Sequence, residues 1–243
     1  MTTALILSAG SDIARSIAAA LAKEGYDLQL AGRNVFELNK DAKDLTIRSG
    51  KGVEVYEWDA LNFDSHPAFY ASLKKRPDLV VCVTGYLGDQ KFAESDRGEM
   101  MKILNTNFAG CVSVLEEAAR EMEKNKSGGI IGISSVAGER GRASNYFYGS
   151  AKAGFTAYLS GLRNRLFFSG VHVLTVKPGF VRTKMTEGLP LNPMLTANPD
   201  QVAADVVKAW KKKKNSIFTL WFWKWIMAII RNVPEGKFKT MKL

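Results

Sequence analysis

Short runs of β-branched and other apolar residues alternate with helical patterns along the whole chain. Seven runs predict strands: Ala4–Leu7, Asp27–Ala31, Val53–Glu57, Leu79–Val83, Gly129–Ser134, Val171–Lys177 and Ser216–Leu220. Between them lie apolar residues at helical spacing, such as Ile13, Ile17 and Leu21. Such alternation is typical of a parallel sheet with right-handed crossovers and helices on both faces. The apolar runs DLVVCV and GIIGI suit strands that are buried on both faces.

The length of the chain is sufficient for one sizeable core. It has 243 residues, of which 46% are hydrophobic, and no repeat or Pro/Gly-rich linker divides it. We therefore predict one α/β domain over residues 1–243, a doubly wound Rossmann-type parallel sheet of about seven strands. In this architecture ligands bind beyond the carboxyl ends of the strands, so the loops that follow the strands are the places to look for chemistry.

The net charge of +10 is concentrated near the end of the chain. From Val206 onward there are ten Lys/Arg and one Glu, which together give +9. The rest of the chain is nearly neutral, which argues against a nucleic-acid enzyme with a basic face. Residues 211–243 are named here the basic aromatic segment.

Cysteine usage and the first residues favour the cytoplasm. Cys82 and Cys111 lie in apolar surroundings and are expected to be buried free thiols rather than a bridge or a metal pair, so we predict no metal site. The chain enters its first strand without a charged and then apolar leader, so nothing indicates secretion.

The loop after the first predicted strand, in LILSAGSDIAR, resembles a dinucleotide-binding turn. Ser8, Asp12 and Ala14 stand where the pattern TGxxxGIG has glycine, and all three are small or tolerated in turns. The loop can therefore still direct backbone N–H groups at a phosphate, although an ordinary helix cap is the alternative. Asp12 would bring an anion close to the pyrophosphate, a charge that would be offset if its side chain capped the helix N–H groups instead. Four loop residues are predicted cofactor contacts: Ser8, Gly10, Ser11 and Ile13.

The second predicted strand ends in LAGRN. A site for NAD has an acidic residue at this place for the ribose hydroxyls, and here Gly32 stands instead. Arg33 follows, and its guanidinium suits a 2′-phosphate. The sequence thus favours NADP(H), with a solvated surface arginine as the alternative.

The segment ISSVAGERGRASNYFYGSAKAGF contains three candidate catalytic residues. Tyr148 and Lys152 are four residues apart in a helical pattern, so they share one helix face. An ammonium near a phenol favours the phenolate, which makes the hydroxyl a usable general acid or base. Ser135 follows the fifth predicted strand, where its hydroxyl can bond the same substrate oxygen. We predict that Ser135, Tyr148 and Lys152 are catalytic.

Together these motifs resemble the short-chain dehydrogenase/reductase family over nearly the whole chain. The resemblance implies a fourth catalytic residue, Asn107 in ILNTNFAG, although an asparagine that only packs its helix is the alternative. It also assigns Asp59 and Ala60 to the adenine ring. Further implied cofactor contacts are Gly85 in CVTG, Tyr148, Lys152, and Pro178, Gly179, Val181 and Thr183 in KPGFVRT, where an ordinary strand-end turn is the alternative.

The family resemblance implies an NADP(H)-dependent oxidoreductase that transfers hydride between nicotinamide and a carbonyl or secondary alcohol. In it Tyr148 transfers the proton, Ser135 orients the oxygen, Lys152 tunes Tyr148, and Asn107 positions a water leading to Lys152. A homo-oligomer, a dimer or a tetramer, is also implied. Two departures from the family pattern concern cofactor binding: the first loop lacks its glycines, and CVTG stands in place of NNAG. The missing glycines support an alternative function, a non-catalytic NADP(H)-binding sensor or membrane-docking protein.

Four segments resemble one branch of the family more narrowly. GDQ, DSHP, GERGRASNYFYGSAKAG and RNVPEGKFKTMKL are similar to the branch that includes decaprenylphosphoryl-2-ketoribose reductase. This resemblance implies a keto-sugar carried on a polyprenyl phosphate. Arg140 and Arg142 are candidates for holding a substrate phosphate, with solvated surface charge as the alternative. His66 and His172 have no partner in the sequence pattern and receive no role.

The basic aromatic segment favours contact with the inner face of an anionic membrane. Its apolar part, Ile217–Ile230, is interrupted by Lys224 and is too short to span a bilayer. Tryptophan and lysine beside aliphatic residues suit a helix in a lipid interface, and we predict that Lys211–Lys214 and Trp221–Trp225 form the contact. Alternatively, the same aromatic residues cover the core or a subunit interface.

Overall fold

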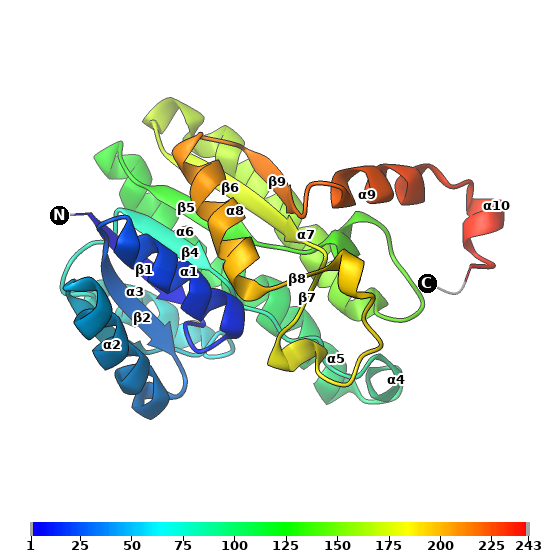
Figure 1. Cartoon of the computed structure of the whole chain (residues 1–243), viewed down its shortest axis with the longest axis horizontal. Helices are drawn as coiled ribbons and strands as arrows, with labels where there is room; N and C mark the ends of the chain where they lie inside the picture. The colour runs from blue at the N-terminus through cyan, green and yellow to red at the C-terminus, as the bar shows by residue number, and fades with distance from the viewer. Residues whose placement is uncertain (1, 242–243) are drawn as a thin grey trace.

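The computed structural model describes residues 2–241 and contains a parallel sheet of seven strands in the order β3-β2-β1-β4-β5-β6-β9 (Figure 1). The strands are β1 (Thr3–Leu7), β2 (Asp27–Gly32), β3 (Val53–Glu57), β4 (Leu79–Cys82), β5 (Gly129–Ile133), β6 (His172–Pro178) and β9 (Ser216–Thr219). Each predicted strand is present, with ends that differ by at most one residue. The predicted fold class is therefore confirmed.

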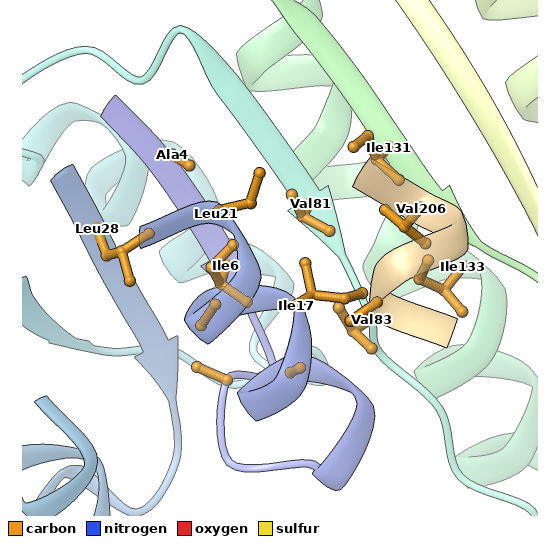
Figure 2. Packing of buried hydrophobic residues seen from close by; sticks show 14 of the residues in the cluster. Ala4, Ile6, Ile17, Leu21, Leu28, Val81, Val83, Ile131, Ile133 and Val206 are labelled. Carbon is orange, nitrogen blue, oxygen red and sulfur yellow. The ribbon is translucent and has the colours of Figure 1, made fainter. Parts of the chain in front are cut away.

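Helices cover both faces of this sheet. The main ones are α1 (Asp12–Lys23), α2 (Val35–Ser49), α3 (His66–Ser72), α5 (Arg97–Leu104), α6 (Gly110–Asn125), α7 (Tyr146–Leu166) and α8 (Pro199–Lys211). Along β1 the side chains alternate: Ala4 and Ile6 join a core with α1, α2 and α8, whereas Leu5 and Leu7 join a second core with α3, α6 and α7. Figure 2 shows the first core, where Ile17 and Val206 meet the sheet.

The strand order reverses beside β1. β1 pairs with β2 on one side and with β4 on the other, so the loops after β1 and β4 lie next to each other. The hydroxyl oxygens of Ser8 and Thr84, one from each loop, are 2.9 Å apart. This reversal is where doubly wound sheets place their ligands.

Beyond the predicted elements, the chain forms a small second sheet and two helices near its end. β7 (Phe180–Val181) pairs in parallel with β8 (Thr196–Ala197). α9 (Trp223–Asn232) and α10 (Glu235–Phe238) extend from one end of the domain (Figure 1). Within residues 2–241, no helix has the length and apolar character needed to cross a bilayer.

Gly110, the first residue of α6, allows that helix to approach the loop after β3. A Cβ at this position would overlap the carbonyl oxygen of Ala60, which is backbone and cannot move aside cheaply. Gly110→Ala should therefore lower the free energy of unfolding by about 1–3 kcal/mol, as overpacked substitutions do. Gly161→Ala, at an exposed position of α7, is the control, because its Cβ would meet nothing within 4 Å; this change should stabilise the protein by about 0.5–1 kcal/mol. Urea unfolding of both variants measures the two effects, and equal stabilities would contradict the close approach.

Candidate active site

A cleft of about 490 Å³ lies beyond the carboxyl ends of β1, β2 and β4. It is lined by seven of the predicted cofactor-binding residues: Ser8, Gly10, Ser11, Arg33, Asp59, Ala60 and Gly85. Ile13 is not part of this lining, because its side chain packs against the first core. The cleft also includes residues that sequence reasoning missed, among them Arg15, Tyr86, Lys102 and Lys184.

The loop after β1 keeps a glycine-like backbone without the glycine. Ser8 has φ of 58°, in the left-handed region that L-residues adopt at a cost. The hydroxyl contact with Thr84 and the bond from the Ala9 N–H to the Ala31 carbonyl (3.0 Å) hold this conformation. Ser11 then accepts a hydrogen bond from the Ala14 N–H and caps α1.

The Asp12 side chain does not cap α1. Ser11 occupies the N-cap position, and Asp12 is the first residue of the helix. The Asp12 carboxylate instead accepts a hydrogen bond of 2.8 Å from the backbone N–H of Lys184, in the loop after β7. The anion is thereby engaged by a loop on the far side of the cleft.

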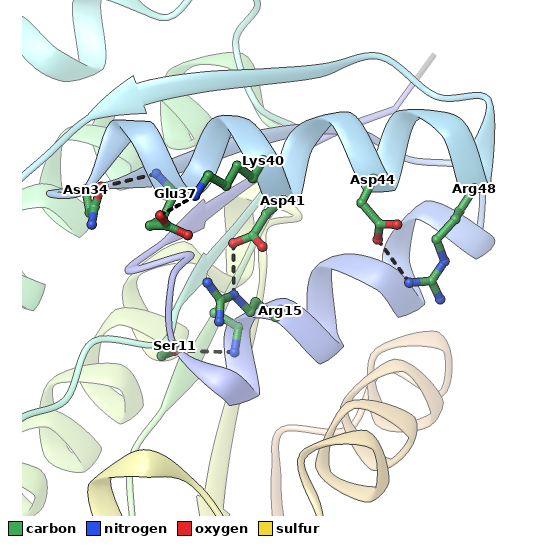
Figure 3. A network of polar contacts seen from close by, with 9 residues as sticks. Ser11, Arg15, Asn34, Glu37, Lys40, Asp41, Asp44 and Arg48 are labelled. Carbon is green, nitrogen blue, oxygen red and sulfur yellow. Dashed lines mark hydrogen bonds and ion pairs between the residues drawn. The ribbon is translucent and has the colours of Figure 1, made fainter.

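Two arginines flank the cleft at the end of β2. Arg33 is exposed, and Arg15 extends from α1, where its Nε is 2.9 Å from an Asp41 carboxylate oxygen (Figure 3). Glu37 also lines the cleft, but Lys40 donates a hydrogen bond to it and lowers the pKa of that carboxyl. The mouth of the cleft thus presents two guanidinium groups and one carboxylate that is already paired.

His66, for which no function was predicted, holds the backbone at Asp59. It is buried, with Nε2 3.0 Å from the Asp59 carbonyl oxygen and Nδ1 2.8 Å from the Ser113 hydroxyl. Since a carbonyl only accepts, Nε2 carries the proton. His172, by contrast, lies against Trp210 at the other end of the sheet, where burial lowers its pKa.

Asn107 is fully buried in a π-helical turn, Asn105–Ala109, between α5 and α6. Its Nδ2 donates to the carbonyls of Tyr86 (2.6 Å) and Ile103 (2.8 Å), and its Oδ1 accepts from the Tyr86 N–H (3.1 Å). A Cβ on Gly85 would lie 3.7 Å from both Asn107 Oδ1 and Lys152 Nζ. Asn107 therefore fixes the loop after β4 and borders the space in front of Lys152.

Lys152 is 2% exposed, and its ammonium is held by backbone carbonyls. Nζ donates to Thr84 (2.9 Å) and Ile133 (3.2 Å), which leaves one of its three protons for another acceptor. The ammonium lies 5.8 Å from the centroid of the Tyr148 ring. Ser134, not predicted from the sequence, donates to the Lys152 carbonyl at 2.9 Å and helps to hold this turn of α7.

Two glycines allow the Ser135 loop to pack closely against α7, the helix that carries Tyr148. A Cβ on Gly138 would lie 2.7 Å from the Ala153 nitrogen, and one on Gly149 would lie 2.9 Å from the Ala137 carbonyl oxygen. The Ser135 Oγ accepts from the Ala137 N–H at 3.1 Å, so its own proton is available to a substrate. Ser135, Tyr148 and Lys152 are thus brought to one end of the sheet.

The predicted nicotinamide segment after β6 is covered by α9. Trp223 packs directly on Gly179, where any Cβ would overlap the indole, and its Nε1 donates to the Leu195 carbonyl at 3.2 Å. Trp223 is only 3% exposed, so its predicted place in a membrane contact is wrong. Pro178, Gly179, Val181 and Thr183 do not line the 490 Å³ cleft; Lys184, which follows them, does.

Arg140 is not available for a substrate phosphate. Its Nη1 donates to the carbonyls of Ile230 and Val233, both at 2.6 Å, and its Nη2 bonds Glu235 at 2.8 Å. It therefore fastens the end of α9 to the Ser135–Tyr148 loop. Arg142 is partly buried against Met227, and this burial lowers the pKa of its guanidinium.

Several known proteins are similar to this chain in sequence or in architecture. The family model for short chain dehydrogenases matches residues 2–193. An uncharacterized oxidoreductase of Mycobacterium tuberculosis is 34% identical over 235 residues, covering 96% of this chain and 92% of the relative. One from Streptomyces coelicolor is 31% identical, covering 98% and 94%. A solved short-chain dehydrogenase from Sphingobium yanoikuyae in complex with NADPH has a TM-score of 0.83 at 20% identity, over 97% of this chain and 98% of that one.

Proposed function

This chain belongs to the short-chain dehydrogenase family, and we propose that it transfers hydride between NADP(H) and a carbonyl or secondary alcohol. The observation that carries the proposal is the buried ammonium of Lys152 beside Tyr148. Burying a cation costs several kcal/mol. A protein that only senses the nucleotide does not need this buried cation. Proton transfer from a phenol does benefit from it, because an ammonium favours the phenolate.

The residues of the cleft fit a phosphorylated dinucleotide. The amino end of α1 and the Gly10 N–H offer donors to a pyrophosphate, whereas the Ser11 N–H already bonds the Ser8 carbonyl at 3.1 Å. Asp59 and Ala60 border the adenine end. Arg15 and Arg33 suit a 2′-phosphate, and Gly32 supplies no carboxylate to repel it. When bound, NADP(H) supplies or accepts the hydride. Solved structures of similar fold that are described as NADPH complexes support the same choice.

In the direction of reduction, the protein's own groups deliver a proton to the carbonyl oxygen. Tyr148 donates this proton, and the Ser135 hydroxyl donates a hydrogen bond to the same oxygen. The Lys152 ammonium stabilises the negative charge that develops on the Tyr148 oxygen. Asn107 keeps the loop at Gly85 and Tyr86 in place, and we keep the proposal that it positions a water leading to Lys152.

For the substrate, we propose a keto-sugar on a polyprenyl phosphate as the first compound to test. Its support is the resemblance of four segments to the decaprenylphosphoryl-2-ketoribose reductase branch. Measuring NADPH oxidation with a panel of keto-sugars, steroids and acyl ketones decides among these substrate classes. We also propose a homo-oligomer, a dimer or a tetramer, on the basis of the family resemblance; sedimentation velocity measures it.

Cofactor choice should depend on Arg33. Arg33→Ala should weaken NADPH binding about ten- to hundred-fold, because a hydrogen bond to a charged group is worth about 1.5–3 kcal/mol. NADH binding should change by no more than a few-fold. Arg48→Ala is the control, since Arg48 lies at the far end of α2 and pairs with Asp44 (Figure 3). Fluorescence titration with both cofactors measures the effect; wild-type binding of NADH as tight as that of NADPH would contradict it.

Turnover should require the Tyr148 hydroxyl. Tyr148→Phe should abolish reduction while NADPH binding stays within a few-fold, because only the transferable proton is lost. Lys152→Ala should impair both, since the ammonium also holds the carbonyl of Thr84, a residue that lines the cofactor cleft. Tyr146→Phe, two residues earlier and more exposed, controls for the loss of a hydroxyl in this helix and should keep activity. Retained reduction by Tyr148→Phe would mean that another group is the acid.

A further inference from the structure

α9 has one buried face and one exposed face. Trp223 and Met227 are buried in a cluster with Val136, which anchors the helix to the domain. On the other face lie Trp225 and Ile229, which are four residues apart and 59% and 70% exposed. Trp221, 74% exposed, lies in the turn just before α9. These three large apolar side chains are named here the α9 stripe.

The α9 stripe is fixed in its exposed position. Arg140 holds the carboxyl end of α9 through the Ile230 and Val233 carbonyls, and Trp223 holds the amino end against Gly179. Turning the stripe inward would break both attachments. A ligand that covers the stripe therefore has to come from outside the domain.

Positive charge flanks the α9 stripe. Residues 221–241 contain four cations, Lys224, Arg231, Lys237 and Lys239, of which Arg231 pairs with Glu139 at 3.2 Å. The one acid in this range, Glu235, is bound by Arg140. Anionic headgroups complement these cations, and tryptophan suits the boundary between headgroups and acyl chains. A symmetric contact with a second copy would instead bring like charges together.

We propose that the α9 stripe docks on an anionic lipid surface and so places the catalytic end of the domain at a membrane. α9 contacts both Gly179 and Val136, the residue after Ser135, so the lipid surface adjoins the site. An apolar or lipid-carried carbonyl compound then reaches the enzyme without crossing bulk water. The docking itself does not depend on the proposed catalytic function, because it is measured without substrate.

Besides burying Trp223, the structure changes the predicted membrane contact in a second respect. Lys211–Lys214 lie at the amino end of β9, whereas α9 follows its carboxyl end (Figure 1). The four residues of β9 span about 13 Å, more than a Debye length at physiological salt. Lysines beside α9 should therefore contribute more to docking than the run of four lysines does.

Vesicle sedimentation at 0.15 M salt tests the docking, with phosphatidylglycerol/phosphatidylcholine vesicles compared with pure phosphatidylcholine. Wild type should bind the anionic vesicles, and a Trp221→Ser/Trp225→Ser/Ile229→Ser variant should bind about ten-fold more weakly or worse. Phe167→Ser/Phe168→Ser is the matched control, because these rings are 70% and 92% exposed on a different part of the surface. Lys224→Gln/Lys237→Gln should lose about five-fold per charge, and Lys211–Lys214→Gln should lose less.

A second readout needs no variant. Vesicles with brominated acyl chains should quench the tryptophan emission of the wild-type protein, since Trp221 and Trp225 enter the bilayer boundary. Wild type that stays in the supernatant with anionic vesicles and shows no quenching would overturn the proposal. A stripe variant whose sedimentation coefficient falls to that of a smaller oligomer, with wild type not bound to lipid, would also overturn it and identify a contact between copies.

Discussion

The buried ammonium of Lys152 organises the catalytic end of this protein. It donates to two backbone carbonyls, those of Thr84, just after β4, and Ile133, the last residue of β5. Lys152 itself belongs to α7. One cation thus joins two adjacent strands to a helix near the place where the strand order reverses. A buried cation without acceptors would cost several kcal/mol, so the geometry of these three elements and the position of the charge depend on one another.

The other features of the site preserve that arrangement. Gly138 and Gly149 allow the Ser135 loop to touch α7, and Asn107 fixes the loop that contains Tyr86. α9 then covers the outside of the site: Trp223 packs on Gly179, and Arg140 ties the end of α9 to the Ser135–Tyr148 loop. An exposed apolar stripe therefore lies on an element that also shapes the catalytic end of the domain.

The sequence predicted the parts that depend on local pattern. Strand positions follow from apolar runs, and the helical spacing of Tyr148 and Lys152 placed them on one face. It did not predict contacts between distant segments: Trp223 on Gly179, Arg140 at the end of α9, or His66 with Ser113. The bond between Asp12 and the Lys184 backbone was missed because the two residues are 172 positions apart in the sequence. Arg15 was missed although it lies one turn after Ser11, a helix position that faces the cleft.

The most direct test of the account is hydride transfer in a variant that lacks the buried charge. NADPH deuterated at nicotinamide C4, incubated with a small activated diketone, requires no knowledge of the physiological substrate. Wild type should give one deuterium on the carbinol carbon of the product and Lys152→Met almost none, as measured by mass spectrometry. Labelled product formed at the wild-type rate by a folded Lys152→Met variant would contradict the central role of the ammonium.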